Sequence, residues 1–139
     1  MPNSIDQYKP VQLLIPLPQA ATAHGVAVNV VPGESPAYDA IAIVSLGAVT
    51  GTPDSFSVIV TIEESATSGG TYDTLATFAT ATGTTNVASK PFTINPAKPF
   101  IRATATIAFV NGTSPKIPVD VIALIHQSVA TSTNEGALA

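Results

Sequence analysis

The sequence predicts an all-β protein, a two-sheet antiparallel β-sandwich of jelly-roll-like type with an extended N-terminal arm. The first observation behind this prediction is that 12 prolines and 9 glycines divide the 139 residues into short β-branched runs. Such spacing is typical of short antiparallel strands. The second is that threonine and valine occupy positions where a helix would carry leucine, glutamate or lysine. We therefore expect roughly seven or eight strands in two sheets.

The composition argues against several classes of protein. The chain is 45% hydrophobic but only 10% charged, whereas about 25% charged residues is usual, and disordered proteins are poor in apolar residues. The absence of cysteine excludes a disulfide scaffold, a cysteine nucleophile and iron–sulfur ligation. A net charge of −4 with five cations argues against direct binding of nucleic acid, which needs a cationic surface.

Residues 1–20 form the predicted arm. Four prolines lie in this range and enclose the apolar run 11–15. Because proline removes a hydrogen-bond donor and fixes the backbone, the segment is predicted to be an extended arm or an edge strand rather than a central strand. We assign residues 21–130 to the sandwich, and residues 131–139, which are small and polar, to a flexible C-terminal tail.

Two runs show the clearest strand pattern. The apolar face consists of alternate residues from Phe56 to Ile62 in one run and from Ile101 to Phe109 in the other. Residues 40–49 are apolar enough to predict a strand that is buried on both faces. The remaining expected strands cover residues 27–31, 74–80, 91–94 and 119–125.

Two turns predict which strands are paired. Asn111-Gly112 is a strong hairpin signal, and we expect it to place residues 119–125 beside residues 100–110. Residues 65–71, which contain Gly69-Gly70, are expected to turn strand 56–64 into a strand over residues 72–80.

Few residues are suited to catalysis or metal binding. His24 and His126 are the two histidines, neither is followed by a second ligand at metal-binding spacing, and no Gly-x-Ser-x-Gly elbow is present. Glu63 and Glu64 are adjacent and so face opposite sides of a strand. With Asp73 they could form a weak calcium site, but a solvated hairpin end is the preferred interpretation. We expect a protein that is not an enzyme, with no catalytic residue, metal or cofactor.

The sequence also bears on where the protein is made. Its first residues lack the charged and then apolar layout of a secretory signal, and its apolar runs are far shorter than the ~20 residues of a membrane-spanning helix. We therefore expect synthesis in a host cytoplasm and no contact with a membrane.

Residues 55–126 carry a family resemblance. Its motifs are Glu63-Glu64-Ser65, Gly69-Gly70-Thr71-Tyr72, Phe100-Ile101-Arg102-Ala103, Thr113-Ser114-Pro115 and Val119-Asp120-Val121-Ile122-Ala123-Leu124. In this order they resemble small virion proteins of tailed bacteriophages, the capsid cement or decoration proteins. The resemblance implies a β-sandwich subunit on the capsid exterior, often a dimer or trimer. Such a subunit binds adjacent copies of the major capsid protein and stabilises the DNA-filled head.

Apolar residues of the arm and the tail are the expected contacts with the capsid or with other subunits. Burial of such side chains contributes ~25 cal/mol per Å² of apolar area removed from water, and many identical copies add to the effect. The expected interface residues are Val11, Leu13, Leu14, Ile15, Leu17, Val129 and Leu138.

Two alternative functions remain open. A structural protein of the phage tail or connector would share the same properties at another place on the particle. A head-fibre or glycan-binding β-sandwich module is the other alternative, because sandwiches host many binding sites. The absence of tryptophan weakens the glycan-binding interpretation.

Overall fold

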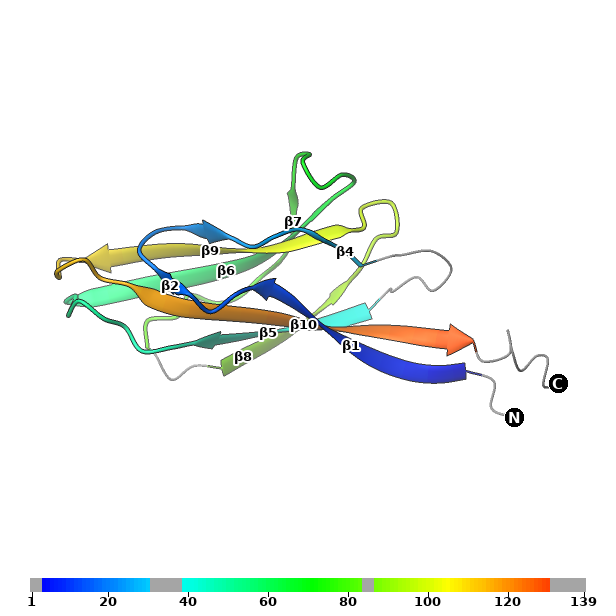
Figure 1. Cartoon of the computed structure of the whole chain (residues 1–139), viewed down its shortest axis with the longest axis horizontal. Helices are drawn as coiled ribbons and strands as arrows, with labels where there is room; N and C mark the ends of the chain where they lie inside the picture. The colour runs from blue at the N-terminus through cyan, green and yellow to red at the C-terminus, as the bar shows by residue number, and fades with distance from the viewer. Residues whose placement is uncertain (1–3, 31–38, 84–86, 131–139) are drawn as a thin grey trace.

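The computed structural model describes residues 4–30, 39–83 and 87–130, and every regular element in these ranges is a β-strand. Two antiparallel sheets pack face to face (Figure 1). The first sheet contains β1 (Ser4–Leu14), β2 (Pro18–Gln19), β5 (Asp39–Leu46), β8 (Val87–Thr93) and β10 (Ile117–Ala130). The second contains β3 (Ala23–His24), β4 (Val28–Asn29), β6 (Ser55–Ser65), β7 (Asp73–Thr77) and β9 (Phe100–Val110). The predicted two-sheet antiparallel β-sandwich is confirmed.

The strand pairs are nested along the chain. In the first sheet the order is β1-β10-β5-β8, with β2 also paired to β10. In the second it is β3-β9-β6-β7, with β4 also paired to β9. The outermost pair in sequence is thus β1 with β10, followed by β3 and β4 with β9, β5 with β8, and β6 with β7. The jelly-roll type stays a prediction, which this nested pairing supports.

The core lies between the two inner faces. On β6 and β9 the predicted period of two is observed, because alternate apolar residues are buried while their neighbours face outward. The first sheet supplies the opposing layer mainly from β5 and β10. The fully buried side chains with the largest volumes are Leu13, Ile62, Ile94, Ile101, Ile117, Ile125, Val58, Val60, Val119 and Val121.

The prediction that residues 40–49 form a strand buried on both faces is wrong for β5. Ala40, Ala42 and Val44 face the core, whereas Ile41 is 37% exposed on the opposite side. Strand β5 therefore alternates like a strand with one solvent face. Its apolar run arose from isoleucines on the outer face, which periodicity alone does not distinguish from core residues.

The connection between β9 and β10 shows that the pairing predicted from Asn111-Gly112 is wrong. Asn111 and Gly112 do adopt positive φ, at 58° and 96°, but β10 pairs with β1 and β5 in the other sheet. The turn is held instead by a loop after β5, where the Thr113 amide donates to the Gly51 carbonyl at 2.7 Å. Strand β10 therefore lies in the sheet opposite β9, and its apolar face is buried in the core between the two sheets.

The turn over residues 65–71 matches its prediction. Strands β6 and β7 pair from Thr61 with Thr77 to Glu64 with Asp73, with an irregularity after Ile62. This is the innermost of the nested pairs, and it is the one that a short turn can close within a single sheet.

Residues 4–14 of the predicted arm form an edge strand, one of the two alternatives that their prolines indicated. Strand β1 pairs with β10 from Ser4 with Ala130 to Leu14 with Val121, so the first sheet begins well before residue 21. A register shift between Gln12 and Leu14 inserts an extra residue. In a regular strand consecutive side chains face opposite ways, and this bulge lets Leu13 and Leu14 both enter the core. The predicted tail, residues 131–139, lies outside the described residues.

Strand β1 is predicted to stabilise the sandwich and not merely to extend from it. Leu13 is 1% exposed and Leu17, four residues later, is 59% exposed. Leu13→Ala should lower the free energy of unfolding by about 2–5 kcal/mol, the usual effect of a cavity in a core. Leu17→Ala is the matched control and should change it by less than about 0.5 kcal/mol. Equal unfolding midpoints of the two variants in urea would show that β1 is an appendage.

Candidate functional site

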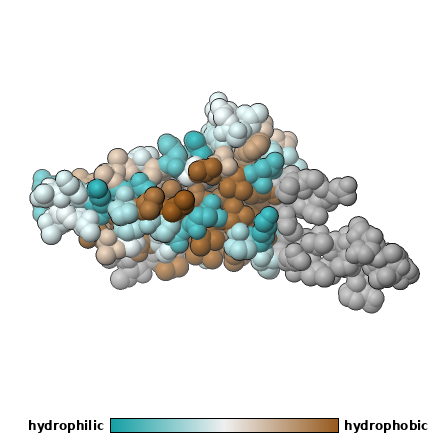
Figure 2. Space-filling model, viewed as in Figure 1, coloured by the Kyte–Doolittle hydropathy of each residue, from teal (hydrophilic) through white to brown (hydrophobic). Residues whose placement is uncertain are grey.

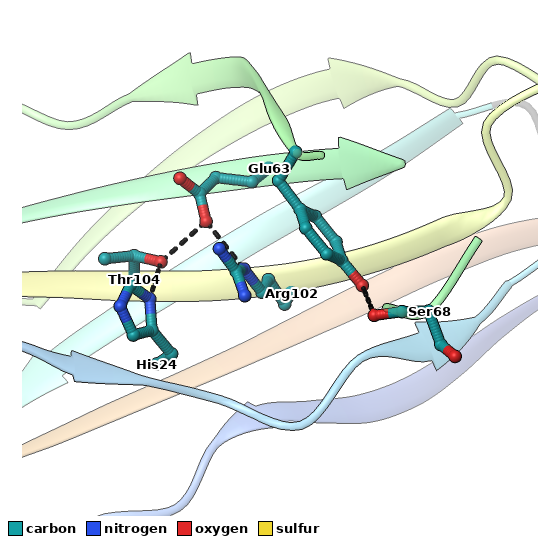
Figure 3. Close-up of polar contacts among 6 residues, drawn as sticks. His24, Glu63, Ser68, Arg102 and Thr104 are labelled. Atoms are coloured by element: carbon teal, nitrogen blue, oxygen red, sulfur yellow. Dashed lines mark hydrogen bonds and ion pairs between the residues drawn. The ribbon is translucent and has the colours of Figure 1, made fainter. Parts of the chain in front are cut away.

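A polar cluster occupies the outer face of the second sheet (Figure 3). Strand register places Glu63 on β6 opposite Arg102 on β9, and Thr104 on β9 opposite His24 on β3. Arg102 Nε donates to Glu63 Oε1 at 2.8 Å, and the Thr104 hydroxyl donates to the same oxygen at 2.6 Å. His24 Nδ1 lies 2.8 Å from Thr104 Oγ1. The cluster therefore links three neighbouring strands through one carboxylate.

The hydrogen bonds assign the tautomer of His24. A carboxylate only accepts hydrogen bonds, so the single hydroxyl proton of Thr104 is directed at Glu63. The Thr104 oxygen must then accept a hydrogen bond from His24, whose Nδ1 carries the proton. In the neutral ring this leaves Nε2 as an acceptor.

Tyr72 joins the cluster to the β6–β7 turn. The guanidinium carbon of Arg102 lies 3.9 Å from the centre of the Tyr72 ring, which is cation–π geometry. The Tyr72 hydroxyl donates to the carbonyl of Ser68 at 2.7 Å. Glu63, Tyr72 and Arg102 come from separate motifs of the phage resemblance, so the structure brings these motifs together in space.

The order of groups in the cluster defines what it can do. In nucleophilic catalysis a histidine lies between the hydroxyl and the carboxylate and removes the hydroxyl proton. Here the hydroxyl of Thr104 lies between His24 and Glu63, and Thr104 is buried. Its oxygen is therefore placed to bridge strands and is not accessible to a substrate.

The described residues contain neither a metal cluster nor a membrane-spanning helix. Within residues 4–30, 39–83 and 87–130, no three histidine, aspartate or glutamate side chains are grouped to hold a metal ion. No helix in the same ranges is long and apolar enough to cross a bilayer.

A second ion pair lies near the start of β7. Lys98 Nζ is 2.6 Å from Asp73 Oδ2, and this hydrogen bond, with the charge of Asp73, raises the pKa of Lys98 above its usual 10.5. A raised lysine pKa means that the contribution of the pair to stability is present below pH 10.5 and is lost as the pH rises through the folded-state pKa. Both side chains are well exposed, so the contribution is screened by solvent.

An apolar groove forms where β1 leaves the first sheet. Ile15, Leu17 and Val26 are 56%, 59% and 79% exposed and line a hollow of about 260 Å³. Figure 2 shows hydrophobic surface gathered over the middle of this face, in the region where β1 passes into β2. We call Ile15, Leu17 and Val26 the apolar rim.

Gly25 allows the two sides of the groove to approach each other. A Cβ atom at this position would overlap the carbonyl oxygen of Leu13, so only glycine permits the backbone to pass this close. The Gly25 amide also donates to the carbonyl of Ala103 at 2.8 Å, which anchors this loop to β9.

The structure separates the predicted interface residues into distinct environments. Leu13 and Leu14 are buried in the core of their own chain and leave little surface for contact with another subunit. Val11 is half-buried and packs against the same core. Ile15 and Leu17 are exposed on the apolar rim. The two remaining residues are Val129, which lies in β10 but whose side chain is not described, and Leu138, which lies outside the described residues.

Sequence reasoning missed Val26 and the role of Thr104. The sequence signal for Val26 was a large apolar residue directly after Gly25, although Leu17 and Ile15, its partners in the apolar rim, are nine and eleven residues away. No pattern along the chain could pair His24 with Thr104, which is 80 positions away. Neither a protein-family model nor a curated protein matches the chain.

The partly buried pair of Glu63 and Arg102 is predicted to stabilise the outer face of the second sheet. A double-mutant cycle with Glu63→Gln and Arg102→Met should give a coupling free energy of about 1–3 kcal/mol, because hydrogen bonds to charged groups are strong. The same cycle at Asp73 and Lys98, with Asp73→Asn and Lys98→Met, should show no measurable coupling. Chemical denaturation of the wild type, the four single variants and the two double variants gives both values. Equal coupling free energies at the two pairs would contradict the expectation that the more buried pair contributes more to stability.

Proposed function

We propose that the chain is a non-enzymatic structural protein that docks on a protein shell through its apolar rim. Together with the resemblance to phage cement proteins, this leads to a specific role. The protein would bind the outer surface of a phage capsid and bridge adjacent subunits of the major capsid protein. The observation that carries the proposal is that Ile15, Leu17 and Val26 are exposed side by side around one groove.

The free energy available from this surface is sufficient for docking when many copies bind. Complete burial of a valine, leucine or isoleucine side chain contributes about 1.5–3 kcal/mol relative to its exposed state. Three such side chains give several kcal/mol before the cost of association is subtracted. A single contact would therefore be weak, whereas repeated contacts on a symmetric lattice, or in a dimer or trimer of this chain, would add up.

The charge of the chain favours the exterior of the shell. Five cations against nine acidic residues give a net charge of −4. An interior surface in contact with packaged DNA would instead need cationic groups to neutralise phosphates. Assembly on the capsid exterior, after synthesis in the host cytoplasm, is the location that agrees with this charge.

The apolar rim is predicted to be required for binding to capsids. Ile15→Asp and Leu17→Asp each place a charge in the groove and should reduce binding at least tenfold. Val110→Asp is the matched control, because Val110 is 51% exposed at the end of β9 and outside the groove. Binding is measured by co-sedimentation with particles assembled without this chain, after circular dichroism has shown that each variant is folded.

Two outcomes would contradict the proposal. Full binding by Ile15→Asp and Leu17→Asp would remove the rim from the interface. Binding to isolated tails or connectors, with none to capsids, would transfer the same structural role to that part of the particle.

A further inference from the structure

A second hollow lies on the outer face of the first sheet, away from the apolar rim. Its volume is about 560 Å³, and its lining includes Tyr8 on β1, His126 on β10, Asp39 on β5 and Thr93 on β8. All four strands of the main path of this sheet therefore contribute to its wall. Tyr8 and Leu14 are six residues apart on β1, which corresponds to about 20 Å, so the hollow and the apolar rim are separate surfaces.

Strand register arranges the residues of this face in two parallel rows. The first row runs across the four strands from Tyr8 through His126 and Asp39 to Thr93, and each of these side chains carries a polar group. The neighbouring row, two residues along each strand, is entirely apolar. Its members are Pro10, Leu124, Ile41 and Pro91. Since paired strands lie about 4.8 Å apart, each row is about 14 Å long.

One end of the polar row is an aromatic wall. The rings of Tyr8 and His126 are stacked with their centres 5.0 Å apart and an angle of 30° between their planes. Tyr8 is nevertheless 60% exposed, so most of its ring is available for contact with a ligand. An aromatic side chain held by its neighbour loses little conformational entropy on binding, which favours a preformed site.

We propose that this hollow binds a short oligosaccharide. A sugar ring has a face of C–H groups and a rim of hydroxyl groups. The apolar row with Ile41 and Pro91 would contact the C–H face, and the polar row would exchange hydrogen bonds with the hydroxyls. Asp39 would accept hydrogen bonds, while Tyr8 and Thr93 can donate or accept them. The length of the rows suits more than one linked ring.

The alternative occupant, a cationic side chain of a protein, is less well matched. Asp39 is the one charged residue among those that line the hollow, and it is exposed. An ion pair with an exposed carboxylate contributes only about 0–1 kcal/mol. Such a ligand would also leave the polar groups of Thr93 and the apolar row largely unused. The paired rows therefore favour a saccharide.

This inference goes beyond the docking role, because it concerns a separate surface on the outer face of the first sheet. A subunit attached to a shell through the apolar rim would keep the hollow free for a sugar. The two proposals can also fail independently, since Ile15→Asp tests docking and leaves the hollow unchanged.

An array of bacterial surface oligosaccharides, probed with the intact labelled protein, tests the proposal. We expect at least one oligosaccharide to bind, and its dissociation constant is then measured by calorimetry. Tyr8→Ala and Asp39→Ala should each weaken that binding at least tenfold. Tyr8→Phe keeps the ring and should retain most of the affinity. Thr106→Ala, on the exposed outer face of the second sheet, is the matched control and should bind like the wild type.

Three results would overturn the assignment. The first is an array on which no oligosaccharide binds. The second is saccharide binding that Tyr8→Ala and Asp39→Ala leave unchanged although both variants are folded by circular dichroism. The third is a hexa-arginine peptide that binds in a Tyr8-dependent and Asp39-dependent manner while no oligosaccharide does, which would identify a site for cations.

Discussion

The structure depends on the burial of two apolar sheet faces against each other. Neither sheet could remain folded alone, because each has one face of valine, isoleucine and alanine that must be removed from water. Nested pairing meets this requirement by sending most successive connections from one sheet to the other. Strand β1 completes the arrangement at the edge of the first sheet, where a bulge lets Leu13 and Leu14 both reach the core.

Once the inner faces are buried, the two outer faces are free to differ. That of the second sheet carries a network in which Glu63, Arg102 and Thr104 satisfy one another. Groups engaged in this way have little capacity left for a ligand. The first sheet instead exposes isoleucine and proline beside a row of polar side chains, and the apolar rim lies at its edge. The chain has few charged residues, and its exposed surface instead includes apolar regions that are suited to contact with other molecules.

Sequence alone predicted what depends on local periodicity. The alternation in β6 and β9 identified their core faces, and the Gly69-Gly70 turn identified the partner of β6. It failed where long-range burial outweighs a local signal, as at Asn111-Gly112, where a hairpin-type backbone leads into the other sheet. It also did not reveal that Leu13 and Leu14 both enter the core, because a bulge cannot be read from composition. The apolar rim could be found only in part, since Val26 joins Ile15 and Leu17 through folding.

We propose that this β-sandwich docks on the outside of a protein shell through its apolar rim. Electron cryomicroscopy of particles assembled with and without the chain would show directly where it docks. We expect additional density on the capsid exterior, into which the sandwich fits with Ile15, Leu17 and Val26 against the major capsid protein. Additional density confined to the tail, or a sandwich that meets the shell through the opposite end of the molecule, would contradict it.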